Sequence, residues 1–378
     1  MTDYEKQQTL LIQTCKSIEK KKHVHHVSMA VENLEGTFKF NYHSGVRNKE
    51  GDVFKQDTPF MIASVTKLFI ATTILKLHEL NKLDLDDLVC QHLNEDLIEG
   101  VHVYKGKSYH KELTIRHLIS HTSGILDYIE VKDENKKTIF DRVIEEGDQT
   151  FGIPMMCDIV KKKSGAYFPP QKKHLSKKKA RYSDTNFQLL RAIIERVTKT
   201  SSDEAFKTMI FEPLGMDNTF LPIDKKEKPY TDVATLWVME KPLNVPLALR
   251  SFGDYYSTTR DLFTFMRALF NHKLFKNKAT FDLMMHDFTT FSLSFSPVAP
   301  AWPIAYSKGL MRFTMPRLFT GFKTMPTLYG HTGVGSAFLF YSPELDLMFT
   351  GTVGQVRYTA LPFQMLPRLL VKLKKLTN

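Results

Sequence analysis

Cysteine is scarce in this chain of 378 residues, and only Cys15, Cys90 and Cys157 are present. Because the three are widely spaced and odd in number, they support neither a disulfide framework nor a cysteine-based metal site. The sequence also lacks an uncharged apolar run long enough to cross a membrane, and it shows no internal repeat and no signature of a nucleic-acid-binding module. We therefore expect no cofactor, no metal, no nucleic-acid partner and no transmembrane segment.

The composition is that of an ordinary globular protein, with 42% hydrophobic and 25% charged residues. The formal net charge is +11. Part of this excess is concentrated in a lysine-rich loop, residues 171–181. Two interpretations of this loop remain open, namely a solvated surface and a surface that steers anionic substrates.

The two ends of the chain support predictions about location and membrane contact. The N-terminus lacks the basic start and apolar run of a secretory signal, so we expect a cytoplasmic protein unless a leader was trimmed. Near the C-terminus, residues 367–378 place leucines on one face of a predicted helix and lysines elsewhere. We expect this face to pack against a sheet, with contact to a membrane surface as the alternative. The sequence does not reveal the oligomeric state.

The N-terminal region reads as one helix followed by two strands. Residues 3–22 form an amphipathic pattern whose expected buried side chains are Leu10, Leu11, Ile12, Cys15 and Ile18. Alternating patterns then predict strands over 27–31 and 37–42, joined by a turn at 33–36.

Helical patterns dominate from residue 64 to about 220, whereas residues 231–378 mix strands and helices. We therefore predict a sheet domain made of residues 1–63 and 225–378. A mainly helical subdomain, residues 64–224, is inserted into it, with the active site in the cleft between the two.

A serine and a lysine three residues apart begin the helical region, in the segment Ser64-Val65-Thr66-Lys67. On a helix this spacing returns nearly to the same face, so the lysine amine can lie beside the serine oxygen and help to remove its proton. The same spacing also starts at Ser17, Ser108 and Ser176, but only Ser64 stands before an apolar helical run. We predict a buried helix that begins at Ser64.

Two further segments complete a set of three. Tyr182-Ser183-Asp184 precedes a helical pattern, and His331-Thr332-Gly333 precedes a strand-like run over 337–341. In this order the three segments resemble the Ser-x-x-Lys, Tyr-x-Asn and Lys/His-Thr-Gly motifs of the serine β-lactamase and penicillin-binding-protein superfamily. The branch that they resemble holds the class C β-lactamases, DD-carboxypeptidases and related esterases. Further phrases similar to that branch lie at 83–87, 114–124, 257–262 and 342–344.

The resemblance implies an α+β fold of the β-lactamase/transpeptidase type, in which an antiparallel sheet is flanked by N- and C-terminal helices and carries an inserted helical subdomain. It also implies catalytic roles for Ser64, Lys67 and Tyr182, although either Lys67 or Tyr182 could be the base of acylation. The backbone N–H groups of Ser64 and Val334 would form the oxyanion hole. Substrate-binding roles fall to Asp184, His331, Thr332 and Gly333.

Two of these positions depart from the usual motifs. Asp184 stands where many relatives have asparagine, which puts hydrogen-bond donation to a substrate amide carbonyl in doubt. His331 stands where many β-lactamases have lysine, which removes a fixed positive charge at neutral pH. Both departures argue against a dedicated β-lactamase.

A metal-binding alternative rests on His117 and His121, which are four residues apart. A glutamate would have to follow the first histidine in a zincin motif, but Leu118 stands there. We expect Thr114 to cap a helix and residues 121–124 to form a turn.

The sequence thus predicts a metal-free serine hydrolase that acts through an acyl-enzyme on esters or amides of a small molecule or peptide, with weak β-lactam hydrolysis as an additional activity. One alternative is a penicillin-binding D-Ala-D-Ala carboxypeptidase or β-lactamase. The other is a non-enzymatic scaffold that has kept the fold.

Overall fold

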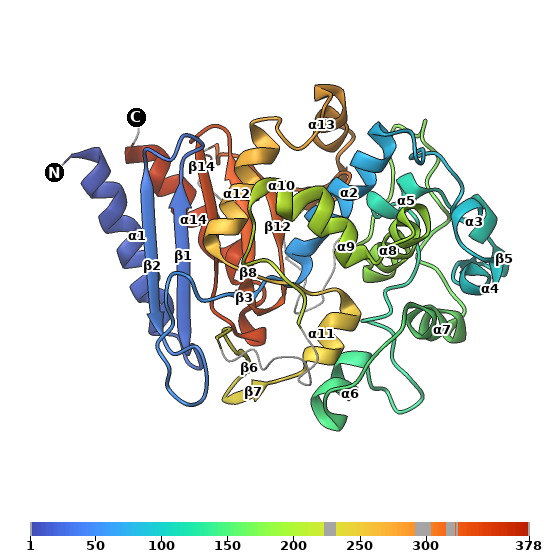
Figure 1. Cartoon of the computed structure of the whole chain (residues 1–378), viewed down its shortest axis with the longest axis horizontal. Coiled ribbons are helices and arrows are strands. Elements are labelled where there is room, and N and C mark those ends of the chain that lie inside the picture. Colours follow the sequence, from blue (N-terminus) through green and yellow to red (C-terminus); the bar gives the residue numbers. More distant parts are fainter. Residues whose placement is uncertain (1, 223–231, 292–303, 315–321, 323, 377–378) are drawn as a thin grey trace.

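The computed structural model describes residues 2–222, 232–291, 304–314, 322 and 324–376. Within these residues lies an eight-stranded sheet in which every neighbouring pair of strands is antiparallel (Figure 1). In order across the sheet the strands are β2 (Lys39–Gly45), β1 (His26–Glu32), β14 (Leu347–Thr352), β13 (Phe338–Ser342), β12 (Leu328–Thr332), β11 (Met311–Phe313), β10 (Ile304–Tyr306) and β9 (Thr289–Thr290).

Helices cover the sheet on both faces. Successive side chains of a strand point to opposite faces, yet the first six residues of β1 are all buried. The N-terminal helix α1 (Asp3–Glu19) and the C-terminal helix α14 (Leu361–Leu376) pack against each other, while α12 (Thr259–Phe270) contacts β1, β13 and β14 (Figure 1). The predicted antiparallel sheet with terminal helices is therefore confirmed.

The two terminal helices also test individual predictions. Leu11, Cys15 and Ile18 are buried along one stripe of α1, as predicted, but Ile12 is 37% exposed. The prediction for Ile12 was wrong because the next residue along a helix is turned about 100° away from the buried stripe. In α14 the side chains of Leu369, Leu370 and Leu373 are buried, so the apolar face of this helix is used in packing.

A second group of helices surrounds α2 (Lys67–Glu79), which contacts β12 at the sheet and α8 at the other side. Every residue of α2 from Lys67 to Leu75 is buried, so this helix holds its neighbours in fixed places. Figure 1 shows most of these helices beside the sheet. They are α3 (Val89–His92), α4 (Glu95–Ile98), α5 (Ile115–Ile119), α6 (Ile139–Glu146), α7 (Ile153–Lys163), α8 (Asp184–Thr198), α9 (Ser202–Phe206) and α10 (Glu212–Leu214).

Local sequence signals account for several helix starts. Thr114 is the N-cap of α5, where its hydroxyl accepts a hydrogen bond from the His117 N–H, as predicted. The hydroxyl of Thr258 accepts from the Asp261 N–H at the start of α12 in the same way. In α1, Thr2 and Glu5 form a capping box.

Short elements connect the two groups. Two-stranded pairs are formed by β3 (Phe60–Met61) with β8 (Tyr256–Ser257), β4 (Val103–Tyr104) with β5 (Lys107–Ser108), and β6 (Leu236–Val238) with β7 (Lys241–Leu243). The remaining helices are α11 (Pro246–Phe252), which contacts α8 through Gln188, and α13 (Lys278–Met285). The domain boundary predicted at 224/225 lies outside the described residues, and the division into two domains stays a prediction.

Candidate active site

Ser64 lies on a short 3₁₀ turn, η1 (Ala63–Thr66), between β3 and α2. The α-helix thus begins at Lys67, three residues later than the sequence predicted. Ala63 has a φ of 46°, a left-handed conformation that is strained for a residue with a side chain. Ser64 is the one partly exposed residue between Phe60 and Leu75, so the turn presents its hydroxyl at the edge of a buried core.

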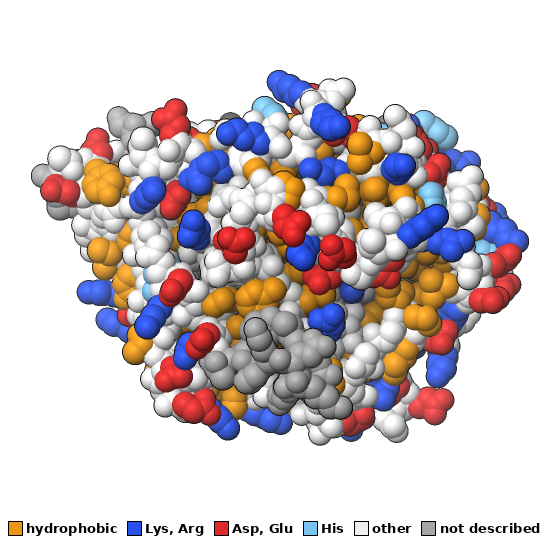
Figure 2. Space-filling model, viewed as in Figure 1, with side chains coloured by type: hydrophobic (Ala, Val, Ile, Leu, Met, Phe, Trp, Pro, Cys, Tyr) orange, Lys and Arg blue, Asp and Glu red, His pale blue; other side chains and the backbone are white. Residues whose placement is uncertain are grey.

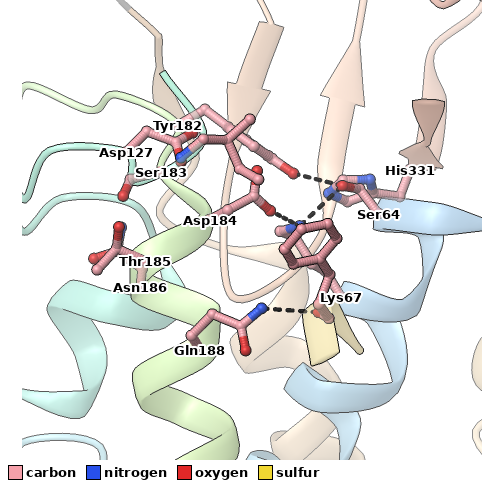
Figure 3. Close-up of polar contacts among 12 residues, drawn as sticks. Ser64, Lys67, Asp127, Tyr182, Ser183, Asp184, Thr185, Asn186, Gln188 and His331 are labelled. Atoms are coloured by element: carbon pink, nitrogen blue, oxygen red, sulfur yellow. Dashed lines mark hydrogen bonds and ion pairs between the residues drawn. The ribbon is translucent and has the colours of Figure 1, made fainter. Parts of the chain in front are cut away.

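Three polar side chains converge on Ser64 from two helices and a loop (Figure 3). The Lys67 ammonium donates to Ser64 Oγ at 2.9 Å, and the Tyr182 hydroxyl donates to the same oxygen at 2.9 Å. Lys67 also forms a salt bridge with Asp184, the first residue of α8. The structure therefore brings together Ser64, Lys67, Tyr182 and Asp184. Ser64 and Tyr182 are 118 positions apart in the sequence.

The electrostatic surroundings keep the Tyr182 phenol protonated. Burial and the negative charge of Asp184 raise the pKa of Tyr182 well above its ordinary value. The Lys67 ammonium lies 5.1 Å from the centre of the Tyr182 ring. A tyrosine acts as a base near neutral pH only if nearby cations lower its pKa, and the pKa of Tyr182 is raised instead.

Two further carboxylates lie near Asp184, and the sequence analysis did not single them out. Asp127 is buried, and burial together with the negative charge of Asp184 raises its pKa well above the usual range. Asp254 lines the cavity beside Ser64, and burial raises its pKa to about 7. These two residues come from loops without a recognisable motif, so only their positions in the fold identify them.

The end of strand β12 approaches Ser64 closely. A Cβ atom on Gly333 would lie 2.4 Å from the backbone oxygen of Ile62 and 3.1 Å from the backbone nitrogen of Ser64. Only glycine fits this approach without displacing the backbone. Val334 follows in the turn η5 (Val334–Ser336) and lines the cavity next to Ser64. Thr332 is buried at the end of β12.

His331 lies behind the site rather than in it. Its side chain is fully buried, its Nε2 is 3.2 Å from the Tyr306 hydroxyl, and its Nδ1 is 2.6 Å from the backbone oxygen of Thr332. Burial and the positive charge of Lys67 lower the pKa of His331 to about 3, so the imidazole is neutral at pH 7. A substrate carboxylate finds neither a cation nor an exposed group at this position.

His121 supports the loop that carries Tyr182, a role that the sequence analysis missed because it weighed this residue as a metal ligand or as part of a turn. Its Nδ1 accepts hydrogen bonds from the Ser183 N–H at 3.2 Å and from the Asn186 side chain at 3.1 Å. Its backbone oxygen accepts from the Arg181 N–H at 3.0 Å. Two backbone groups flanking Tyr182 are thus fixed by one buried histidine.

The side chains of His117 and His121 do not point toward a common site. His117 Nδ1 contacts the N-cap residue Thr114, and its Nε2 lies 3.0 Å from the backbone oxygen of Gln171. Both ring nitrogens of His117 therefore point toward groups other than His121. No cluster of three or more metal-ligating side chains occurs in the part of the chain that the structure describes.

A cavity of about 100 Å³ opens beside Ser64 and Lys67. Its acidic lining residues are Asp184 and Asp254. Most of the other lining side chains are apolar and include Met61, Ile70, Phe140, Leu236, Leu249 and Phe252. The arrangement provides a nucleophile, a proton donor and a compact apolar space for one part of a substrate.

The lysine-rich loop does not line this cavity. Lys172, Lys173 and Lys178 instead line a second, separate cavity beside α5. Lys172, Lys173, Lys177 and Lys179 are exposed, as expected of a solvated surface, and the steering of anionic substrates stays a prediction.

A family model described as Beta-lactamase matches residues 16–356 of this chain. Among curated proteins, the chain is 26% identical over 226 residues to the putative penicillin-binding protein PbpX of Bacillus subtilis. That match covers 59% of this chain and 49% of PbpX. The chain thus spans about half the length of this relative.

Solved structures of the same fold cover nearly the whole chain. D-amino acid amidase from Ochrobactrum anthropi SV3 superposes with a TM-score of 0.74 at 20% identity, over 99% of this chain and 100% of the amidase. EstCE1, a hydrolase with promiscuous acyltransferase activity, superposes with a TM-score of 0.72 at 17% identity, over 97% of this chain and 99% of EstCE1. These likenesses establish the fold. Within the described ranges, no helix combines the length and apolar character needed to span a bilayer.

Proposed function

The chain belongs to the beta-lactamase family, as the resemblance of its three motifs predicted, and from this premise we propose that it is a serine hydrolase that acts on esters or amides through an acyl-enzyme. The observation that carries the proposal is the placement of Ser64 Oγ within 2.9 Å of both Lys67 Nζ and Tyr182 OH. This is the nucleophile with two adjacent proton-transfer groups that covalent catalysis requires.

The proton path follows from the donors around Ser64. Because Lys67 Nζ donates to both Ser64 Oγ and Asp184, it accepts the Ser64 proton only after passing one of its own to Asp184. The neutral amine then takes the hydroxyl proton as Ser64 attacks the carbonyl carbon. Tyr182, whose phenol stays protonated, donates a proton to the leaving group. This division of roles favours Lys67 over Tyr182 as the base of acylation.

Stabilisation of the tetrahedral oxygen is assigned to the backbone N–H groups of Ser64 and Val334. The close approach of Gly333 to the Ser64 nitrogen supports this assignment, because it brings the end of β12 beside the turn that bears the nucleophile. Backbone donors fixed in this way need no reorganisation when the negative charge develops. A water molecule then attacks the acyl-enzyme and gives one proton to the Tyr182 phenolate. The acid leaves as Lys67 returns a proton to Ser64 Oγ and recovers its own from Asp184.

The shape of the cavity supports a small apolar acyl group. Its volume of about 100 Å³ leaves little room for a long chain. Asp184 is paired with Lys67, which also lines the cavity, so among the described lining residues Asp254 is the unpaired acidic group, and its negative charge disfavours an anionic acyl group. We therefore place short, uncharged esters and amides ahead of β-lactams, whose carboxylate would meet a neutral, buried His331.

The alternatives predicted from sequence give different outcomes in a substrate panel. A carboxypeptidase would hydrolyse D-Ala-D-Ala peptides faster than p-nitrophenyl acetate, and a scaffold would hydrolyse neither. The name of the relative PbpX favours testing the first alternative directly. Location in the cytoplasm stays a prediction.

The proposal is tested by treating the wild type and Ser64→Ala with a fluorophosphonate and measuring intact mass. We expect one added phosphonyl group and loss of esterase activity in the wild type, and no added mass in Ser64→Ala. An unlabelled wild type that is folded, as judged by its thermal unfolding, would favour the scaffold.

A further inference from the structure

A second cavity, of about 260 Å³, lies where five segments far apart in the sequence meet, and it shares no lining residue with the cavity at Ser64. We call it the basic cavity. Its charged lining residues come from the loop after α2, from α5, from the loop after Pro170, from the segment before β9 and from the turn after β10. They are Arg116, Lys172, Lys173, Lys178 and Lys308 as cations, and Asp86 and Asp287 as anions.

The cations outnumber the anions by five to two, and the carboxylates do not neutralise them all. Asp86 is shared, because it accepts from Arg116 at 2.6 and 3.0 Å and from Lys173 at 2.9 Å. Within the described residues, Lys172 and Lys178 form no ion pair. Asp287, which pairs with Lys308, also interacts electrostatically with Lys178, so this one carboxylate is shared between two lysines.

Lys308 makes the site more than a patch of surface lysines. It is only 2% exposed, and its ammonium contacts the backbone oxygen of His286 at 3.1 Å and Asp287 at 3.3 Å. The side chain of Asp287 is itself 68% exposed, so it compensates the buried charge weakly. A buried ammonium costs free energy unless it is well paired, which favours an anion supplied from the cavity.

The lining of the basic cavity combines cations with hydroxyl groups. On the face shown in Figure 2, Lys and Arg side chains are interspersed with Asp and Glu. In the basic cavity the cations border one concave space, which also has hydroxyl groups in its lining, from Ser120, Thr122 and Thr289. Clustered cations and hydroxyl donors around a concave space are the chemistry that recognises phosphate oxygens.

We propose that the basic cavity is a binding site for a phosphate-bearing ligand, distinct from the hydrolytic site. Several cations around one space suit a group with more than one negative charge, so a diphosphate should bind more tightly than a monophosphate. The ligand can be a soluble phosphorylated compound or the headgroup of a lipid. Because binding does not involve Ser64, this proposal holds or fails independently of the hydrolase activity.

The test is calorimetric titration of the full chain with inorganic pyrophosphate and with inorganic phosphate. We expect saturable binding of pyrophosphate that is tighter than that of phosphate, weakens as sodium chloride is added, and is unchanged in Ser64→Ala. The double variant Lys172→Gln/Lys178→Gln should weaken pyrophosphate binding at least about tenfold, since it removes two cations of the cavity lining that form no ion pair in the described residues.

The matched control is Lys162→Gln/Lys163→Gln, which removes the same charge from exposed positions at the end of α7. It should leave the affinity within about twofold of the wild type. Co-sedimentation with vesicles that contain phosphatidic acid, lost in Lys172→Gln/Lys178→Gln, would identify a lipid headgroup as the source of the phosphate. Equal weakening in both double variants, or no binding of either pyrophosphate or vesicles, would overturn the proposal.

Discussion

Lys67 and Asp184 form a salt bridge at the centre of the site, and the same ammonium donates to Ser64 Oγ. From the sequence, Asp184 put hydrogen-bond donation to a substrate amide carbonyl in doubt. Its contact with Lys67 gives this carboxylate a different task, as the partner and proton acceptor of the lysine. The acidic residue at this position is thus part of the proton path in the proposed mechanism.

Replacing Asp184 by asparagine should lower kcat for ester hydrolysis, because it removes the proton acceptor of Lys67, and it should also change the pH dependence of the reaction. The negative charge of Asp184 is one cause of the raised pKa of Tyr182, so the variant lowers that pKa. Because Tyr182 must be protonated to donate to the leaving group, the alkaline limb of the kcat profile should move to lower pH. The control Asp158→Asn removes an exposed carboxylate and should leave the profile unchanged. A profile of Asp184→Asn identical to that of the wild type would contradict the assigned role.

Asp254 should make stability depend on pH. Its pKa in the folded protein is about 7, above the ordinary value of a carboxyl group. The raised pKa therefore contributes to the free energy of unfolding at acidic pH, and this contribution is lost as the pH rises toward 7. Asp254→Asn should therefore stabilise the protein at pH 8 relative to pH 5, by at most about 3 kcal/mol. Urea unfolding of both proteins at the two pH values measures this difference. If the free energies of unfolding of Asp254→Asn and the wild type differ by the same amount at pH 5 and pH 8, Asp254 does not titrate in this range.

Lysine cannot replace His331 without cost. The family motif often has lysine at this position, but here the side chain is fully buried close to Lys67. His331→Lys should destabilise the fold by about 3 kcal/mol, because it buries a second ammonium without a partner. His331→Gln introduces no charge and should lose less stability. If His331→Lys has the same midpoint of urea unfolding as the wild type, position 331 tolerates a cation.

The length of the acyl chain should be limited by the cavity beside Ser64. Phe140 lines this cavity and is only half-buried, so Phe140→Ala enlarges it at modest cost to the core. We expect kcat/KM for p-nitrophenyl octanoate to rise about tenfold relative to that for the acetate. Phe38→Ala, which removes a half-buried ring packed against Tyr4, serves as the control and should not change the ratio. An unchanged ratio in Phe140→Ala would place the acyl group elsewhere.

Local patterns predicted much of the framework. An amphipathic pattern predicted α1, and alternating patterns predicted β1 and β2. Thr114, a typical N-cap residue, predicted the start of α5. These features depend on neighbours in the sequence, whose spacing is fixed by helix and strand geometry. The motif at Ser64 and Lys67 belongs to the same class, because three residues separate its members.

The remaining features of the site depend on contacts between distant segments. Nothing in the sequence around Asp254 indicates that it faces Lys67, and His121 reveals its support of Tyr182 only when residues 121 and 183 are in contact. The burial of His331 likewise depends on strands packed around it. Periodicity shows which face of an element is apolar, but it does not show which charged groups of other elements meet there.

The central claim, that Ser64 carries the acyl group, is tested most directly by rapid mixing with p-nitrophenyl acetate followed by acid quench and peptide mass analysis. We predict a burst of one p-nitrophenol per chain and an acetyl group on the peptide that contains Ser64, with neither in Ser64→Ala. The variant should remain folded, since loss of this hydroxyl costs at most about 2 kcal/mol. Undiminished turnover by Ser64→Ala, or an acetyl group on a different serine that accounts for the burst, would contradict the account.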